Sequence, residues 1–165
     1  MTRPGRDPQV EAAPGVTVVV PTHRRPQLLL AAVRSVLAQD YAGQLEVIVV
    51  RDACEACVPE VDPPPGRSVR VLENVRTRGL AGARNTGILA ASHSFVAFLD
   101  DDDTWAPDKL TAQMPLFQEH PRAIVVGTGA WFDDGRRRHE RRAPTAVVTH
   151  QQLVLDRVAA LHSSS

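Results

Sequence analysis

Four consecutive aspartates, Asp100 to Asp103, end the apolar stretch in the segment FVAFLDDDDTW. Two like unit charges roughly 4 Å apart repel by about 1 kcal/mol in water and by about 4 kcal/mol at an effective dielectric of 20. Carboxylates that follow a buried strand therefore need a positive partner, and carboxylate oxygens are the ligands that Mg²⁺ and Mn²⁺ prefer. The alternative is a solvated helix N-terminus, in which Asp103 or Thr104 serves as a cap.

Strand geometry adds a detail to the metal hypothesis. Successive side chains of a strand point to opposite sides, so Asp100 and Asp102 can face together while Asp101 points away. We therefore expect Asp100 and Asp102 to share a bound ion.

Further polar residues follow the other expected strands. They are Pro21, Thr22 and His23 after 16–20, Arg51 and Asp52 after 45–50, and Arg76, Thr77 and Arg78 after 68–72. Ligands of open parallel sheets bind outside the carboxyl ends of the strands. We therefore expect these residues to converge with the aspartates on one edge, where arginines beside carboxylates suit a metal that bridges a phosphate.

The elements that would position these residues alternate along the chain. The expected strands are 16–20, 45–50, 68–72, 94–99 and 123–132, and the expected helices are 26–39, 79–92, one that opens near Trp105, and 149–161. Short, continuously apolar strands between helices are typical of an α/β fold with a mostly parallel central sheet covered on both faces. Pro115 should kink or shorten the helix that opens near Trp105.

Two segments have open interpretations. The helix at 79–92 contains three glycines, which indicate either close helix–sheet packing or contact of Arg84 and Asn85 with a ligand. The charged segment DDGRRRHERR is expected to be a turn or loop. Its basic part, 136–142, is either solvated or a contact for lipid head groups or an anionic acceptor.

Composition narrows the class of protein. The chain has 165 residues, which suits one domain. Its 19 basic and 19 acidic residues give a formal net charge of zero, so no overall positive charge would attract nucleic acid. No secretory signal and no apolar run of membrane-spanning length is visible, so we expect a cytoplasmic protein, peripheral to the inner face of the membrane if 136–142 binds lipid. Residues 1–15 are expected to form a disordered lead-in. Cys54 and Cys57 are interpreted as loop thiols, because no second ligand pair for zinc exists.

Three segments resemble a known family: VTVVVPTHRRP, LEVIVVRDA and NVRTRGLAGARNTGILAASHSFVAFLDDDDTWAPDKL. They are similar to the N-terminal, nucleotide-binding portion of family 2 inverting glycosyltransferases with a GT-A fold. The likeness runs from about Val16 to Asp134 and is most specific over 74–110. It implies a Rossmann-like GT-A sandwich in which 16–165 binds the nucleotide sugar. The C-terminal acceptor portion is missing, so we expect a fragment of a longer enzyme.

The resemblance also implies roles for individual residues. FLDDDD corresponds to the DXD motif of the family, so Asp102 would bind Mn²⁺ or Mg²⁺, and Asp100 would contact the ribose or the metal shell. Asp52 would hold the nucleobase, and Pro21 and Thr22 would line the base and ribose. The residues implied for the nucleotide sugar are Pro21, Thr22, Asp52, Arg78, Asp100 and Asp101.

Two departures from the family pattern matter. Arg51 stands where the family has the first acid of a pair, so it would meet a phosphate or a neighbouring carboxylate instead. The family's catalytic base lies in the acceptor half, so we expect it beyond Ser165, and this chain could bind a donor without transferring sugar.

The activity implied for the whole enzyme is transfer of a hexosyl group from a UDP-, dTDP- or GDP-sugar to a saccharide, lipid or protein hydroxyl, with inversion. A carboxylate would take the acceptor's proton, and the metal would stabilise the leaving diphosphate.

Two alternative functions stay open on the residues alone. LDDDDT also fits the D-x-D-x-T pattern of haloacid dehalogenase-type phosphatases, with Asp100 as nucleophile and Asp102 as acid/base. Against this, three expected strands precede the pattern, and Lys109 is the only lysine. The second alternative is a non-catalytic module that binds nucleotide sugars.

Overall fold

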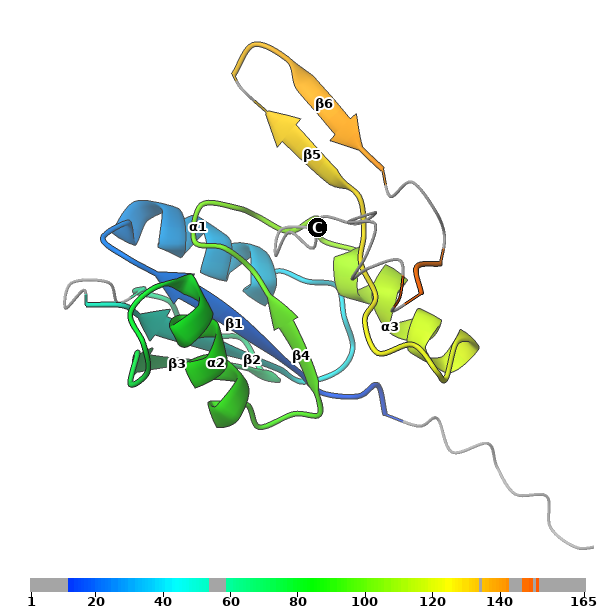
Figure 1. Ribbon diagram of the computed structural model, residues 1–165, viewed down its shortest axis with the longest axis horizontal. Helices are drawn as coiled ribbons and strands as arrows, with labels where there is room; N and C mark the ends of the chain where they lie inside the picture. Colours follow the sequence, from blue (N-terminus) through cyan, green and yellow to red (C-terminus); the bar gives the residue numbers. More distant parts are fainter. Residues whose placement is uncertain (1–11, 54–58, 134, 143–146, 150, 152–165) are drawn as a thin grey trace, which may run out of the picture.

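The computed structural model describes residues 12–53, 59–133, 135–142, 147–149 and 151. Its centre is a four-stranded parallel sheet with the strand order β3-β2-β1-β4 (Figure 1). The strands are β1 (Val16–Thr22), β2 (Leu45–Arg51), β3 (Arg67–Glu73) and β4 (Phe95–Phe98). The α/β fold with a mostly parallel central sheet, predicted from the alternating pattern, is confirmed.

The strand register aligns the carboxyl ends of three strands. Thr22 at the end of β1 pairs with Arg51 of β2, which in turn pairs with Glu73 of β3. β1 is buried along its whole length because β2 and β4 flank it and helices cover both of its faces. Strands in this position read as continuous apolar runs, which is why the composition of 16–20 predicted β1.

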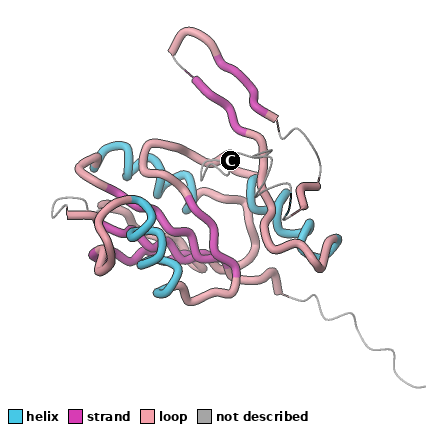
Figure 2. Tube along the Cα trace, in the orientation of Figure 1, coloured by secondary structure: helices cyan, strands magenta, loops and turns pink. Residues whose placement is uncertain are grey.

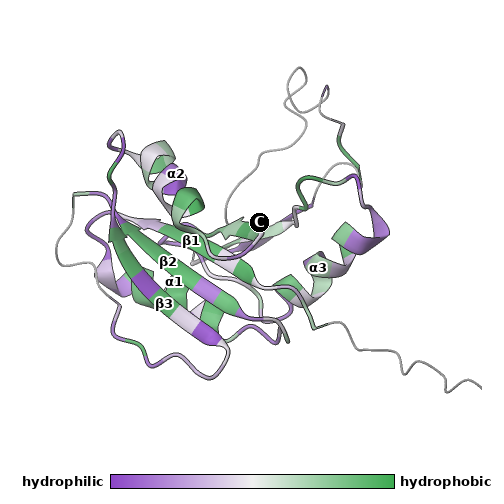
Figure 3. Ribbon diagram, turned by 90° about the horizontal axis from the view of Figure 1, so that it is seen from below, coloured by the Kyte–Doolittle hydropathy of each residue, from purple (hydrophilic) through white to green (hydrophobic). Residues whose placement is uncertain are grey.

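Two helices cover opposite faces of the sheet. α1 (Pro26–Leu37) begins with a proline at its first position, where no backbone N–H is needed, and buries Leu29, Ala32, Val33 and Val36. These side chains pack with Val18 and Val20 of β1, whereas Val19 packs with Ala83 of α2 (Leu80–Ala90). In Figure 3, α2 stands on one side of the sheet, and the strands carry the apolar residues.

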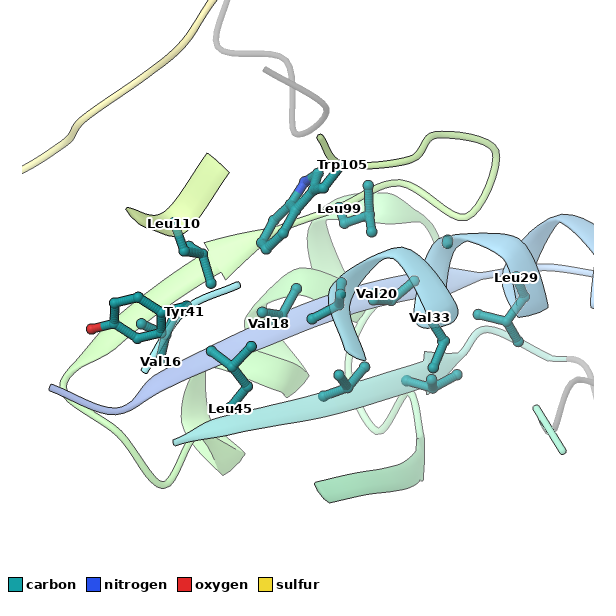
Figure 4. Packing of buried hydrophobic residues seen from close by; sticks show 14 of the residues in the cluster. Val16, Val18, Val20, Leu29, Val33, Tyr41, Leu45, Leu99, Trp105 and Leu110 are labelled. Carbon is teal, nitrogen blue, oxygen red and sulfur yellow. The ribbon is translucent and has the colours of Figure 1, made fainter. Parts of the chain in front are cut away.

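The larger core continues past β4. Leu99, Trp105 and Leu110 are each at most 5% exposed and pack with β1 on the α1 face (Figure 4). The backbone N–H of Trp105 donates to Ser35 Oγ of α1 at 3.1 Å. Trp105 therefore lies in the core ahead of α3 (Lys109–Glu119), which begins later than expected and continues through Pro115.

A hairpin extends away from the sheet (Figures 1 and 2). β5 (Ala130–Asp133) pairs with β6 (Arg138–Arg141) in antiparallel fashion and is not part of the central sheet. The expected strand at 123–132 is therefore wrong over 123–129, and the expected loop DDGRRRHERR contains β6. Residues 123–129 form no strand, and Ile124 among them is 86% exposed.

Some expectations concern positions outside the described residues. They are Cys54, Cys57, most of the lead-in and the helix expected at 149–161. Among the helices that are described, none has the length and apolar character needed to cross a bilayer.

Candidate functional site

The polar ends of the parallel strands meet at one edge of the sheet, as their positions in the sequence predicted. The backbone N–H of Asp52 donates to the Thr22 carbonyl at 3.0 Å, and that of Asn74 donates to the Arg51 carbonyl at 2.8 Å. These bonds continue the strand ladders beyond the strand ends. The loops after β1, β2 and β3 therefore leave the sheet side by side.

The aspartate run joins this edge through Asp101. Its side chain is 9% exposed, and its Oδ2 accepts a 2.7 Å hydrogen bond from Thr22 Oγ1. The backbone N–H of His23 lies 3.4 Å from the same oxygen. Asp101 therefore ties the loop after β4 to the end of β1, and Thr22 and Asp101 lie in direct contact.

The strand alternation expected through the run was wrong. β4 ends at Phe98, and the Asp103 N–H donates to the Asp100 carbonyl at 3.2 Å, which makes 100–103 a turn. The turn sends Asp101 inward, whereas the side chain of Asp102 is 47% exposed. Asp100 and Asp102 keep their carboxylates accessible at the same edge, with different partners.

Two arginines supply positive charge to the run. Arg84 Nη2 of α2 lies 2.9 Å from Asp100 Oδ1, and its guanidinium also stands over the Phe98 ring, 5.6 Å from the centroid. Arg25 Nη1 lies 2.5 Å from Asp102 Oδ2 and 3.4 Å from Asp101 Oδ1. Arg25 was not singled out in the sequence, although it belongs to the loop PTHRRP that follows β1.

Asp52 is held as a carboxylate. Its Oδ1 accepts a 2.8 Å bond from Asn74 Nδ2, and its Oδ2 accepts a 2.7 Å bond from the Gly79 N–H. The bond from Asn74 has the largest effect and lowers the pKa of Asp52. Burial has the next largest effect and opposes it, but the bond from Gly79 and the nearby charges of His23 and Arg78 also lower the pKa, which stays below its ordinary value. Asp52 is therefore ionised at neutral pH.

The turn that positions Gly79 requires glycine. Its φ of 107° lies in a region that side chains disfavour, and this conformation directs the N–H to Asp52. Asn74 was also missed, although it directly follows β3 and the strand-end rule applies to it.

The remaining expected residues have distinct surroundings. Arg51 forms an ion pair with Glu73 of β3, so its charge meets a neighbouring carboxylate, one of the two outcomes expected. Pro21 and Thr22 are buried at the end of β1, and Arg78 is exposed in the turn before α2.

Gly87 supports the packing interpretation of the glycine-rich helix. A Cβ at this position would lie 2.3 Å from Val19 Cγ1 of β1. The helix can therefore approach the sheet closely only with glycine at this position.

The carboxylate oxygens at this edge could bind a divalent ion that is also bound by a ligand. No group of three acidic, histidine or cysteine side chains suitable for a metal occurs among the described residues. Mg²⁺ and similar ions usually take one or two carboxylates together with phosphate oxygens and water. The accessible carboxylates of Asp100 and Asp102 match that requirement.

Comparison with known families agrees with this geometry. The model of the family described as glycosyl transferase family 2 matches residues 17–158. The chain belongs to glycosyl transferase family 2. This membership overturns the phosphatase alternative, which read Asp100 as a nucleophile.

Named relatives in this family are longer than the chain. It is 39% identical over 104 residues to the succinoglycan biosynthesis protein ExoO of Rhizobium meliloti, covering 62% of this chain and 30% of ExoO. It is 30% identical over 112 residues to the UDP-Glc:alpha-D-GlcNAc-diphosphoundecaprenol beta-1,3-glucosyltransferase WfgD of Escherichia coli, covering 68% of this chain and 44% of WfgD. The chain thus spans less than half the length of either protein.

Solved structures share the fold. The mannosyltransferase PcManGT of Pyrobaculum calidifontis, solved with GDP-Man and Mn²⁺, is 31% identical with a TM-score of 0.50 over 61% of this chain and 33% of that chain. S. aureus TarS 1-349 with UDP-GlcNAc has a TM-score of 0.53 at 24% identity, over 65% of this chain and 32% of that chain. The TarS likeness shows the fold alone.

Proposed function

We propose that the chain is the donor-binding part of a glycosyltransferase that uses a nucleoside-diphosphate sugar and a divalent metal. The observation that carries this proposal is the meeting of Asp52, Thr22 and the carboxylates of Asp100 and Asp102 at one edge of the sheet, in a chain of glycosyl transferase family 2. Such an edge is where open parallel sheets bind ligands.

Asp102 and Asp100 would hold the Mn²⁺ or Mg²⁺ ion together with the donor's phosphates. When bound, the ion acts as a Lewis acid that stabilises the negative charge of the leaving diphosphate. The contribution of the protein is to present both carboxylates at the same edge with part of their surface exposed. In the donor-free chain Arg84 lies beside Asp100 and Arg25 lies beside Asp102.

Asp52 would bind the nucleobase or its ribose. Asn74 and Gly79 fix both of its oxygens, so the carboxylate is oriented before a ligand arrives. Because this side chain is already ordered, the free energy of binding is not reduced by the cost of ordering it. Pro21 at the end of β1 would contact the ribose or base, and Arg78 in the turn before α2 would contact the phosphates.

Asp101 has a different proposed role from the other aspartates. Thr22 and the His23 N–H already engage its Oδ2, and Arg25 Nη1 stands 3.4 Å from its Oδ1. We infer that it positions the loop after β1 rather than touching the donor directly. This refines the sequence-based hypothesis, which placed Asp101 among the donor ligands.

The donor classes that we propose are UDP-, dTDP- and GDP-sugars. The 31% identical PcManGT was solved with GDP-Man and Mn²⁺, and the name of WfgD specifies UDP-Glc. The acceptor is a saccharide, a lipid-linked saccharide or a protein hydroxyl. WfgD acts on a diphosphoundecaprenol-linked sugar, and ExoO is named for polysaccharide biosynthesis, which favours the first two classes.

The chemistry proposed for the whole enzyme is direct displacement with inversion. A carboxylate takes the proton of the acceptor hydroxyl, whose oxygen attacks the anomeric carbon as the bond to the diphosphate breaks. We place this base beyond Ser165, in the acceptor half. The alternative is a module that binds the nucleotide sugar without transferring it. In that case the donor would bind, but no product would form even in a chain that includes an acceptor half.

Calorimetric titration of the chain with UDP, dTDP and GDP, with Mn²⁺ and with EDTA, tests the proposal. We expect at least one diphosphate to bind, with an affinity that falls at least about tenfold in EDTA, because the carboxylates and the phosphates would hold the ion together. The corresponding monophosphates, UMP, dTMP and GMP, are the matched controls, since they keep the base but lack the diphosphate and should show little Mn²⁺ dependence. If none of the three diphosphates binds in the presence of Mn²⁺, the proposal is rejected.

A further inference from the structure

The two ion pairs of the aspartate run differ in exposure. The side chains of Arg84 and Asp100 are 27% and 31% exposed, whereas those of Arg25 and Asp102 are 51% and 47% exposed. Exposed ion pairs contribute little to stability, because water and salt screen them. The Arg25–Asp102 pair is therefore the contact at this edge that a ligand breaks most easily.

We propose that Arg25 is a donor-binding residue that exchanges partners when the donor binds. In the donor-free chain it neutralises Asp102, and in the complex it contacts the donor's diphosphate while the divalent ion takes its place on Asp102. This inference rests on the proposed function, since it assumes that a metal and a diphosphate bind at this edge.

Electrostatic repulsion explains why the Arg25 guanidinium leaves Asp102 when a metal ion binds there. Arg25 Nη1 stands 2.5 Å from Asp102 Oδ2. A divalent ion binds a carboxylate oxygen at roughly 2.1 Å, so ion and guanidinium would share one small anionic group. Repulsion between the two cations then drives the guanidinium away, and Arg25 competes with the metal for as long as no diphosphate is present.

The backbone limits the exchange to the side chain of Arg25. Its carbonyl accepts the Leu29 N–H at 2.9 Å, and Pro26 opens α1 directly after it. Asp101, held by Thr22, lies 3.4 Å from Arg25 Nη1 and keeps a negative group beside the released guanidinium. Arg25 therefore stays at the edge after it leaves Asp102.

A diphosphate supplies the second partner. The planar guanidinium matches phosphate oxygens in a bidentate geometry that an ammonium group cannot reproduce. A diphosphate that reaches an ion on Asp102 comes to the same edge as Arg25. The exchange thus keeps Arg25 neutralised in both states and links metal affinity to the presence of the donor.

Two titrations of Arg25→Gln test this exchange. The first measures Mn²⁺ affinity without nucleotide by electron paramagnetic resonance, and the second measures the affinity of the best-binding diphosphate at saturating Mn²⁺. We expect Mn²⁺ to bind about two- to fivefold more tightly to the variant, because its competitor is gone. We expect the diphosphate to bind at least about tenfold more weakly, because a charge-assisted hydrogen bond is lost.

Two further variants complete the experiment. Arg34→Gln removes an exposed arginine of α1, the helix that follows Arg25. Arg34 makes no contact with the aspartate run, so this variant should match the parent in both titrations. Arg25→Lys keeps the charge but not the bidentate geometry. It should bind Mn²⁺ as the parent does and the diphosphate with intermediate affinity, and it serves as the test if Arg25→Gln does not fold by circular dichroism.

The outcomes separate this inference from the proposed function. If the parent itself shows no Mn²⁺-dependent binding of a diphosphate, the proposed function fails. If the parent binds but Arg25→Gln behaves like Arg34→Gln, or loses affinity for both Mn²⁺ and diphosphate, the exchange is wrong while the proposed function stands. Opposite changes in the two affinities are the result that the exchange requires.

Discussion

Thr22 Oγ1 donates a 2.7 Å hydrogen bond to Asp101 Oδ2 across 79 residues of sequence. The bond connects the end of β1 to the turn after β4, and these two strands are neighbours in the sheet. Asp101, the buried member of the aspartate run, therefore has a structural role. Asp100 and Asp102, on either side of it in the sequence, are left accessible for a ligand.

Thr22→Val should destabilise the chain and weaken binding. The substitution keeps the shape of the side chain but removes the donor to a buried carboxylate, which costs about 1–3 kcal/mol in the free energy of unfolding. Urea denaturation measures the loss, and Thr22→Ser, which keeps the hydroxyl, should recover most of it. Equal stability of the valine variant and the parent would show that the bond contributes nothing.

The stabilising effect of Asp52 should depend on pH. Its pKa is lowered in the folded chain, so the stabilisation is fully present above the unfolded pKa near 4 and is lost as the pH falls through the lower folded value. Denaturation at pH 2.5 to 7 should therefore show parent and Asp52→Asn converging only below about pH 4. The control Asp62→Asn changes an exposed residue away from the edge, and its free energy of unfolding should follow that of the parent at every pH. A difference between the parent and Asp52→Asn that does not change with pH would be inconsistent with this account.

Gly87→Ala should destabilise the chain although alanine favours helices. The new Cβ would lie 2.3 Å from Val19 Cγ1, and such overpacking typically costs about 1–3 kcal/mol. Thermal or urea unfolding of a double-mutant cycle with Val19→Ala should show a favourable coupling, because the smaller side chain makes room. Asn85→Ala, at an exposed position of the same helix, should be neutral or slightly stabilising. Additive effects of Gly87→Ala and Val19→Ala would contradict the packing interpretation.

Lys109 should make stability rise with pH in the alkaline range. Burial lowers the pKa of its amine to about 8 from 10.5, so between these values the unfolded chain holds a proton that the folded chain has lost. As the pH rises from 8 to 10.5, the free energy of unfolding of the parent should therefore increase relative to that of Lys109→Met, by up to about 3 kcal/mol. Urea denaturation across this range measures the gain, and parallel curves for parent and variant would show that the amine is not buried in this way.

The central strands were predictable because helices cover both of their faces. The runs at 16–20 and 45–50 are apolar apart from Thr17 and Glu46, and both of these residues are buried. The run at 123–132 is as apolar, yet Ile124 and Val125 are 86% and 56% exposed. Composition indicates that a segment can form a buried strand, but it does not show whether a neighbouring strand is available to pair with it.

The site was predictable in its location more than in its contacts. The rule that ligands bind at the carboxyl ends of parallel strands placed Thr22, Asp52 and the aspartates together without any coordinates. It could not show that Asp101 turns inward, because that depends on where β4 ends and on the turn after Phe98. Contacts such as Arg25 with Asp102 depend on loop conformations that residue types do not specify.

The most direct test of a metal shared between the aspartate run and a donor is the Mn²⁺ dependence of diphosphate binding in Asp102→Asn. The account predicts that the parent binds UDP, dTDP or GDP at least about tenfold more tightly with Mn²⁺ than with EDTA, and that Asp102→Asn loses this difference. Asp133→Asn, on the exposed β5–β6 hairpin, should keep it. An Asp102→Asn variant whose affinity responds to Mn²⁺ as the parent's does would contradict the central claim.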